Sequence, residues 1–423
     1  MSKPGLALAT VATFGGLLAW SSVAHADMTC ADQGSTKPAC STLSNPIYVS
    51  GSTALEPLYK AIGPTLLAQS TPRAIVYIKG GTEASCSGIR RMTATPPEKL
   101  GASLTAKRVD STGAICDCTI DAGGVDVTVA ISDVFAPTCD VTEAAVSAAG
   151  LKDFQGPVNS MVFVAPKGST QTAISFEQAF LALGFGSMYN VLPWTNKDFF
   201  FIRPEYSGTL RMIASYIGVP ATKWQGKSKN AAGDKDAGSG DVYTAITTAA
   251  TGLDQYLGIL GIDYLLTQLD KTPADADKIK PLAFRGSKQR YAFYPDSSPT
   301  SLDKRMVRSG RYLIAGPAHL FAKVIGSDIT DAGAKALIDL VRNEDDAATL
   351  TTIAKTAHLV PQCAMSVSRT IDGGNLSKFT PTNACDCFFE KAVGATVPAS
   401  CVTCDVSTPC ATGTCRRGVC ETR

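Results

Sequence analysis

The sequence predicts a two-lobed α/β protein with a small disulfide-rich appendage at its C-terminus. Short runs rich in Val, Ile, Phe and Tyr alternate with segments of helical periodicity, which favours strands joined by helices in largely parallel sheets. The chain has 423 residues, more than one ordinary domain holds, and 45% of them are hydrophobic. Half of its fourteen cysteines lie between Cys385 and Cys420.

The first 26 residues have the features of a signal peptide. Lys3 supplies a positive charge, Leu6 to Trp20 is apolar, and Ala24-His25-Ala26 fits a signal-peptidase site. A transmembrane anchor is the alternative, but this apolar run is short for a bilayer. We therefore expect a periplasmic or secreted protein whose mature chain starts near Asp27, with a Cys-containing N-terminal segment at 27–44.

The alternation gives specific expectations for each segment. The expected strands span 46–50, 74–78, 125–131, 158–165, 199–202 and 312–315, and the expected helices span 55–68, 175–183, 210–217, 318–324 and 334–341. Polar, Gly-rich stretches at 91–124 and 223–240 are expected to be exposed loops. We expect one lobe to comprise 45–150 and 300–384, and the other to comprise 151–299, with a tail at 385–423.

The tail cysteines have two possible interpretations. Cys401-x2-Cys404 could form half of a zinc ribbon, whereas an oxidising compartment favours disulfides. We predict disulfides, and no metal or other cofactor. Because the tail holds seven cysteines, at least one must pair outside it or remain free, and Cys363 is the nearest candidate.

Composition and motifs argue against several classes of function. With 39 basic and 37 acidic residues, the chain shows no charge excess typical of nucleic-acid binding. Beyond the signal peptide the histidines are His319 and His358, each expected near a helix end, and neither a Gly-x-Ser-x-Gly nor a His-Glu-x-x-His motif occurs. The sequence therefore predicts a protein that is not an enzyme.

Four polar clusters each follow an expected strand and precede a helix or turn. A ligand of an open α/β sheet lies outside the carboxyl ends of its strands, so the four clusters are expected to meet at one site. Gly turns and free N–H groups at helix starts suit an anion, and Arg203 adds a fixed positive charge. The clusters are Ser50-Gly51-Ser52-Thr53-Ala54, the stretch from Gly80 to Ile89, Ser132-Asp133, and the stretch from Arg203 to Thr209.

In these motifs and their order, the chain resembles the phosphate-binding periplasmic proteins of ABC importers, a family of type 2 periplasmic binding proteins. The resemblance runs from about Asn45 to Lys355 and implies that family's two-lobed fold, with the ligand in the cleft between the lobes. It implies a monomer that captures an oxyanion, inorganic phosphate or a related one, for the permease of an ABC importer. The ligand-binding residues that it implies are Thr53, Ala54, Ser85, Asp133, Arg203, Ser207, Gly208 and Thr209, supported by Gly51 and by Glu205 as a partner of Arg203.

The chain departs from that family in its cysteines and its tail. Cys86 lies inside the second cluster, where a bond to Cys139 or Cys116 would pin the turn. The tail has no counterpart in the family, which raises a second hypothesis: a surface or interaction protein that uses the tail on a binding-protein fold. A secreted phosphohydrolase is a third hypothesis, which would need a nucleophile with a base or two metals.

Overall fold

The computed structural model describes residues 29–33, 37–79 and 83–421. The predicted signal peptide at 1–26 lies outside the described residues. None of the helices in these ranges is both long enough and apolar enough to span a bilayer.

The protein is a mixed α/β structure whose main sheet has eleven strands. Its strands follow the order β4-β3-β2-β1-β5-β12-β6-β9-β8, with β10 beside β6 and β13 beside β12. The strands are β1 (Ile47–Gly51), β2 (Ile75–Tyr77), β3 (Thr105–Val109), β4 (Ile115–Thr119), β5 (Val129–Ser132), β6 (Leu151–Pro166), β8 (Phe200–Phe201), β9 (Leu257–Gly261), β10 (Ile279–Pro281), β12 (Ala315–Ile325) and β13 (Asp328–Ile329). Smaller two-stranded sheets pair β7 (Ala173–Ser175) with β11 (Ala283–Arg285) and β14 (Val367–Ser368) with β15 (Ser377–Lys378).

Helices occur between the strands along most of the chain. The longer ones are α2 (Glu56–Leu67), α3 (Ser85–Thr93), α5 (Phe176–Phe185), α6 (Gly208–Ile217), α7 (Ser239–Thr247), α8 (Ile262–Lys271) and α10 (Ala332–Arg342). The shorter ones are α1 (Cys30–Gln33), α4 (Glu143–Ala148), α9 (Arg305–Arg308), α11 (Ala347–Thr351) and α12 (Asp386–Ala392).

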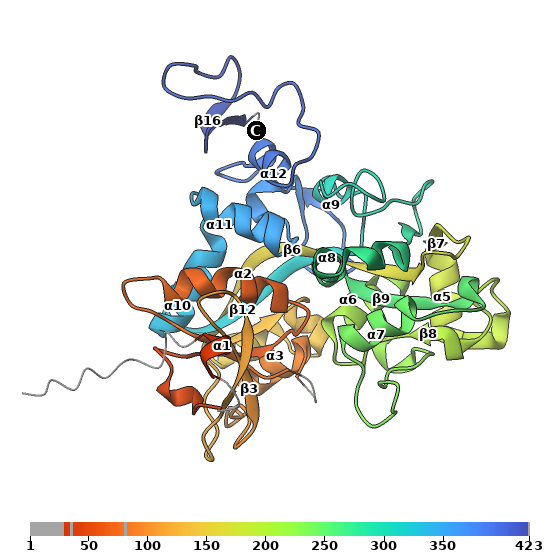
Figure 1. Ribbon diagram of the computed structural model, residues 1–423, viewed down its shortest axis with the longest axis horizontal. Coiled ribbons are helices and arrows are strands. Elements are labelled where there is room, and N and C mark those ends of the chain that lie inside the picture. Colours follow the sequence, from red (N-terminus) through yellow and green to blue (C-terminus); the bar gives the residue numbers. More distant parts are fainter. Residues whose placement is uncertain (1–28, 34–36, 80–82, 422–423) are drawn as a thin grey trace, which may run out of the picture.

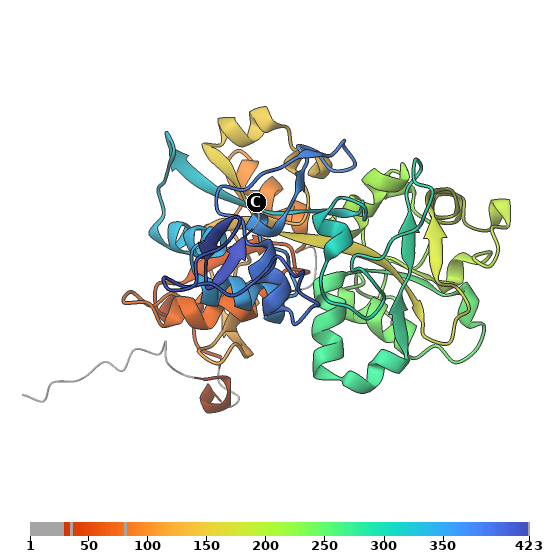
Figure 2. The ribbon, with the colours of Figure 1, turned by 90° about the horizontal axis from the view of Figure 1, so that it is seen from above.

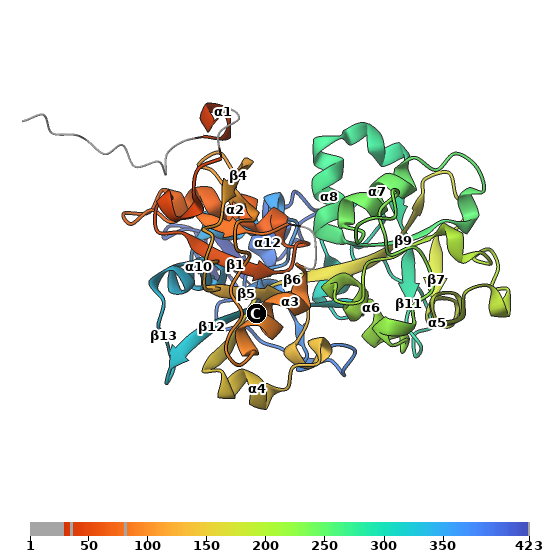
Figure 3. The same ribbon diagram turned by 90° about the horizontal axis from the view of Figure 1, so that it is seen from below.

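The elements form two lobes side by side (Figures 1 and 2). One lobe holds β1–β5, α2, α3 and α10, and the other holds α5–α8, β7, β9 and β11 (Figure 3). The long strand β6 runs from one lobe to the other and pairs with β12 over much of its length. The predicted two-lobed α/β fold is therefore confirmed, while the exact limits predicted for each lobe stay predictions.

The sheet is mixed, which corrects the expectation of largely parallel sheets. β1 is parallel to both β2 and β5, whereas β12 is antiparallel to β5 and β6, and β6 is antiparallel to β9. The parallel part lies where strand and helix alternate in the sequence. The antiparallel strands β6 and β12 join the lobes.

The helix expected at 318–324 is wrong, because this segment belongs to β12. Every residue from Ala315 to Ala322 is buried, and β12 has a neighbouring strand on each side. A strand buried on both faces has a continuous apolar run rather than an alternating one, and such a run also fits a buried helix. His319 therefore lies within a strand, and not near a helix end as expected.

The expectation of an exposed loop at 91–124 is also wrong for the middle of this range. β3 and β4 form a hairpin there, which pairs with β2 at the edge of the main sheet. Disulfides Cys30–Cys116 and Cys40–Cys118 fasten the N-terminal segment to β4.

The C-terminal tail is tied to the body by a disulfide and by ion pairs. Cys363 bonds Cys385, as expected, and the other six tail cysteines pair among themselves. The sulfurs of Cys404, Cys410 and Cys420 lie close together, but each belongs to a disulfide, which argues against a zinc ribbon.

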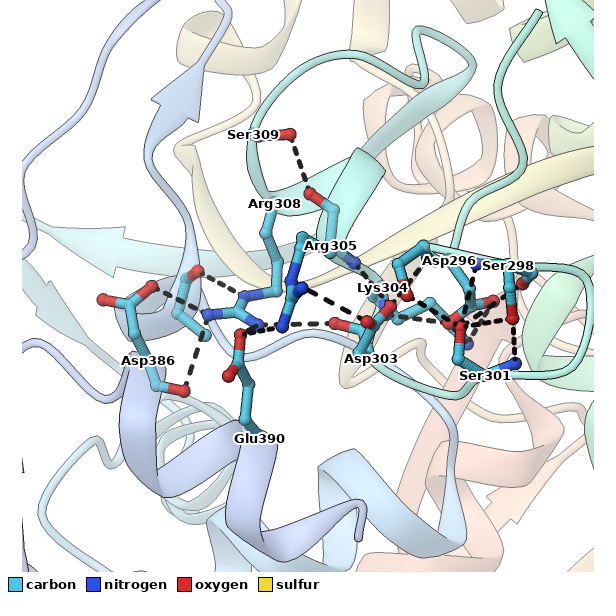
Figure 4. Close-up of polar contacts among 12 residues, drawn as sticks. Asp296, Ser298, Ser301, Asp303, Lys304, Arg305, Arg308, Ser309, Asp386 and Glu390 are labelled. Carbon is cyan, nitrogen blue, oxygen red and sulfur yellow. Dashed lines mark hydrogen bonds and ion pairs between the residues drawn. The ribbon is translucent and has the colours of Figure 1, made fainter. Parts of the chain in front are cut away.

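A buried arginine completes this attachment (Figure 4). Arg308 of α9 donates from Nη1 to Glu390 at 2.9 Å and from Nη2 to Asp386 at 3.0 Å, both on α12. Its Nε donates to the carbonyl of Ala364. Breaking a buried pair leaves an uncompensated charge, so these contacts hold the tail against the segment that leads into β12.

We predict that most of the fourteen cysteines are oxidised in the mature protein. All fourteen cysteines form disulfides in the structure, so alkylation of the denatured but unreduced protein should label at most two of them, and reduction should expose all fourteen. Mass spectrometry counts the labels directly. Stoichiometric zinc together with free thiolates would contradict the prediction.

Candidate functional site

The first predicted turn lies between β1 and α2 and requires a glycine. Gly51 has φ +129°, and a Cβ at this position would lie 2.0 Å from the carbonyl oxygen of Ile131. The N–H of Ser52 donates to the same oxygen at 2.7 Å. The turn is therefore held against the end of β5, which brings the Ser52 hydroxyl within 2.6 Å of Asp133.

The second turn leads into α3, whose first residue is Ser85. The Ser85 hydroxyl donates to Asp133 Oδ2 at 2.9 Å. Disulfide Cys86–Cys139 fastens the start of α3 to the 3₁₀ helix at Ala136–Cys139 that follows β5. Of the two partners considered for Cys86, Cys139 is therefore the one found, and it pins the turn.

Asp133 is the centre of the site. It is almost fully buried, directly after β5, and accepts the Ser52 and Ser85 hydroxyls on Oδ2. Burial raises the pKa of Asp133, while the two hydroxyls and the charges of Arg203 and His319 act in the opposite direction. Its second oxygen, Oδ1, accepts no hydrogen bond from the described residues. One buried carboxylate oxygen thus remains available to a ligand that can donate a proton.

Arg203 contributes the positive charge from the other lobe. Its guanidinium is buried, and it donates from Nε to the Ala237 carbonyl at 2.9 Å and from Nη1 to the Ser239 hydroxyl at 2.6 Å. Burial lowers the pKa of Arg203, and the negative charge of Asp133 raises it. The two groups are therefore close enough to interact across the lobes.

The expected pair between Arg203 and Glu205 is absent among the described residues. Glu205 is exposed in the turn before α6, and its backbone carbonyl accepts from Arg211 Nε. The turn directs this carboxylate to solvent, so Arg203 is held instead by the 237–239 segment before α7.

The start of α6 meets the start of α3 at Asp133. Gly208 is the first residue of α6, and a Cβ there would lie 2.2 Å from Ser85 Oγ and 2.8 Å from Asp133 Oδ2. Ser207 and Thr209 are buried beside it, and Thr209 Oγ1 has no hydrogen-bond partner within the described ranges. Two helix N-termini, each favourable to a negative charge, therefore converge on one point.

A cavity of about 410 Å³ adjoins this cluster. Its wall includes Thr53, Ala84, Arg203, Tyr206, Ser239 and Tyr264. Of the predicted residues, Thr53 and Arg203 line the cavity. Ser85, Asp133 and Gly208 meet in the buried cluster next to it. Ser207 and Thr209 are buried at the start of α6, beside Gly208. Ala54 is buried in the first turn, away from the cavity wall. Their roles as ligand-binding residues stay predictions.

Comparison with solved structures finds similar chains of low sequence identity. A putative phosphate ABC transporter substrate-binding protein with bound phosphate from Clostridium perfringens is 13% identical, with a TM-score of 0.48 over 75% of this chain and 99% of that one. An ABC-type phosphate transport receptor from Vibrio cholerae is 13% identical, with a TM-score of 0.44 over 75% and 100%. The structural neighbours are phosphate-binding proteins.

The sequence itself matches no protein-family model and no curated protein. At these identities and TM-scores, the functional argument rests on the geometry of the site.

The close contact at Gly208 predicts that adding a single methyl group at this position strongly weakens anion binding. Gly208→Ala should weaken anion binding by at least about tenfold, because the new Cβ would force the start of α6 away from Ser85 and Asp133. Gly123→Ala is a matched control, since a Cβ at Gly123 would meet nothing within 4 Å. Calorimetric titration of both variants with phosphate measures the effect. Equal affinities for the two variants would contradict the proposed contact.

Sequence reasoning missed a second buried carboxylate near Asp133. Asp263 lies in the first turn of α8, directly after β9, and is fully buried. Neither of its oxygens makes a hydrogen bond of normal geometry with the described residues. Asp263 Oδ1 and Asn159 Nδ2 are nevertheless neighbours, because a Cβ at Gly261 would lie 2.4 Å from the first and 3.3 Å from the second. Asp263 follows a buried strand as Asp133 does, and this pattern could have identified it. The sequence analysis, however, expects no strand at 257–261.

Asp263 predicts a pH dependence of stability. Burial, with the charge of Asp133, raises the pKa of Asp263 from 3.8 to about 7. The folded state therefore holds a proton that the unfolded state releases near pH 4, so the free energy of unfolding should fall as pH rises from about 4 to 7. Asp263→Asn should remove about 2 kcal/mol of this fall between pH 5 and pH 8.

Chemical denaturation at several pH values tests this expectation. His319 and Asp133, whose pKa values are also raised, are present in wild type and variant alike, so the difference between the two profiles reports Asp263 together with its coupling to Asp133. Parallel pH profiles of wild type and Asp263→Asn would contradict the assignment.

Proposed function

We propose that the protein captures inorganic phosphate between its two lobes and presents it to the permease of an ABC importer, after export to the periplasm or cell exterior. The observation that supports this proposal most strongly is the cluster around Asp133. Two hydroxyls and two helix N-termini surround one buried carboxylate, and a buried arginine from the opposite lobe lies near it.

The composition of this cluster matches a protonated tetrahedral oxyanion. Donors from Thr53, the N–H of Ala54, Ser207, Gly208, Thr209 and Arg203 would bind its oxygens. The Ser85 hydroxyl, which donates to Asp133 in the structure, would turn its proton to the anion. Near neutral pH, phosphate keeps at least one proton that Asp133 Oδ1 can accept, whereas sulfate has none and would meet only repulsion. A single acceptor among many donors thus distinguishes phosphate from sulfate.

The mechanism is recognition. Arg203 and the start of α6 belong to one lobe, while Ser85 and Asp133 belong to the other, so a bound anion would contact both and favour the closed arrangement. Closure removes water from the anion, which strengthens each charged contact. The closed, loaded form is the species that a permease would distinguish from the open one.

Competition tests the ligand class. Phosphate should displace radiolabelled phosphate from the mature protein, and sulfate should not. Phenyl phosphate and methylphosphonate test the space beside Arg203, because the adjoining cavity of about 410 Å³ could hold an organic group. Displacement by sulfate as effective as that by phosphate would contradict the proposal.

A further inference from the structure

A second cavity, of about 490 Å³, lies beside the end of α10 and has none of the residues of the Asp133 cluster in its wall. It is bounded by β6 at Gln155–Pro157, by the end of α10, by α11 and by the segment at 361–379. None of the residues assigned above to phosphate lines it.

The cavity wall includes a buried cation that has one unused hydrogen-bond donor. Arg369 is 8% exposed, and its Nη1 makes no hydrogen bond with any described residue. Its guanidinium lies over the ring of Tyr216, 5.0 Å from the ring centre, and it forms no ion pair within the described ranges. The charge of Arg369 is opposed by that of Asp372, and each stabilises the charged form of the other. A buried donor atom without a hydrogen-bond partner is still costly, and a ligand that accepts from Nη1 recovers that cost.

The rest of the wall defines the ligand further. Arg342 also lines the cavity, and Glu344 is the one acidic residue among the lining residues. The lining therefore carries an excess of positive charge.

The wall of the cavity also has apolar side chains. They are those of Pro157, Val341, Leu350, Pro361 and Phe379. A tetrahedral inorganic anion would gain nothing from these side chains, whereas a planar carboxylate can bind an arginine through two parallel hydrogen bonds and bury an attached apolar group.

We propose that this cavity is a second ligand site, which binds a small organic carboxylate with an apolar body. The carboxylate contacts Arg369, and the apolar body packs against Leu350 and Phe379. The two sites are distinct, because they share no lining residue.

Calorimetric titration with sodium benzoate, using benzyl alcohol as the uncharged analogue, tests the proposal on the full mature chain. Benzoate should bind with one-to-one stoichiometry, and benzyl alcohol should bind at least about tenfold more weakly. Arg369→Gln should reduce benzoate affinity at least about tenfold and leave phosphate affinity unchanged. Arg203→Ala should do the reverse.

A second variant keeps the test independent of the folding of Arg369→Gln. Thr370 is exposed on the cavity wall, so Thr370→Trp should obstruct the cavity while Arg369 stays in place. No benzoate binding to wild type, equal binding of benzoate and benzyl alcohol, or full benzoate binding by Thr370→Trp would each overturn the proposal. Failure of phosphate binding alone would affect only the proposed function.

Discussion

Replacing Arg203 by Ala should weaken phosphate binding by about 2–5 kcal/mol, which corresponds to a loss of roughly 30-fold to several thousand-fold in affinity. Arg203 is a buried cation whose charge acts on Asp133, and its guanidinium is already fixed by Ala237 and Ser239. A desolvated anion would lose its charge partner without gaining water in exchange. Calorimetric titration with phosphate measures the loss.

Arg285→Ala is the matched control for this experiment. Arg285 is a partly exposed arginine paired with Glu177 on the surface, away from both cavities. Its removal should leave phosphate affinity unchanged, because exposed pairs contribute little. Near-wild-type affinity in a folded Arg203→Ala variant would remove Arg203 from the site.

Asp133→Asn should change selectivity more than affinity. The variant keeps the shape of the side chain but replaces part of its accepting capacity with a donor and removes its charge. Sulfate would no longer meet a negative group, so its affinity should rise by about 100-fold relative to that of phosphate. Measuring both affinities in wild type and variant gives the ratio.

Asp254→Asn is the control for a loss of hydrogen bonds alone. Asp254 also accepts from two hydroxyls, those of Ser169 and Thr170, but it does not line the phosphate cavity. If Asp133 merely caps a turn, both variants should lose about 1 kcal/mol of stability and keep the phosphate-to-sulfate ratio of wild type. An unchanged ratio in Asp133→Asn would contradict its proposed role.

The parts of the fold that local pattern determines could be predicted from the sequence. α10 illustrates this: Asp331 accepts from the N–H of Ala334 at its start, and Ala334, Leu337, Ile338 and Val341 form its buried face. Helical periodicity and a capping residue are both local signals. The expected helix at 334–341 and the observed α10 therefore agree closely.

The errors came from segments whose structure depends on distant partners. β12 is a strand because β5 and β6 lie on either side of it, and its apolar run alone does not distinguish strand from helix. The hairpin of β3 and β4 is polar and Gly-flanked, and disulfides from Cys30 and Cys40 fasten it. Neither partnership is visible in a local window.

For the candidate site too, local patterns could be predicted from the sequence and contacts between distant segments could not. Turn chemistry identified the four clusters, and the rule that ligands lie at strand ends predicted that they would meet. Contact between Gly208 and Ser85 depends on how the lobes are placed, so the sequence could not reveal it. Asp263 was missed because β9, with Gly258 and Gly261 in a five-residue strand, resembles a loop in the sequence.

Calorimetric titration of the mature, oxidised protein with phosphate and with sulfate is the most direct test of the central claim, that the Asp133 cluster is a phosphate site. One equivalent of phosphate should bind, with an affinity at least about 100-fold higher than that for sulfate at neutral pH. Absence of phosphate binding, or equal affinities for the two anions, would contradict the account.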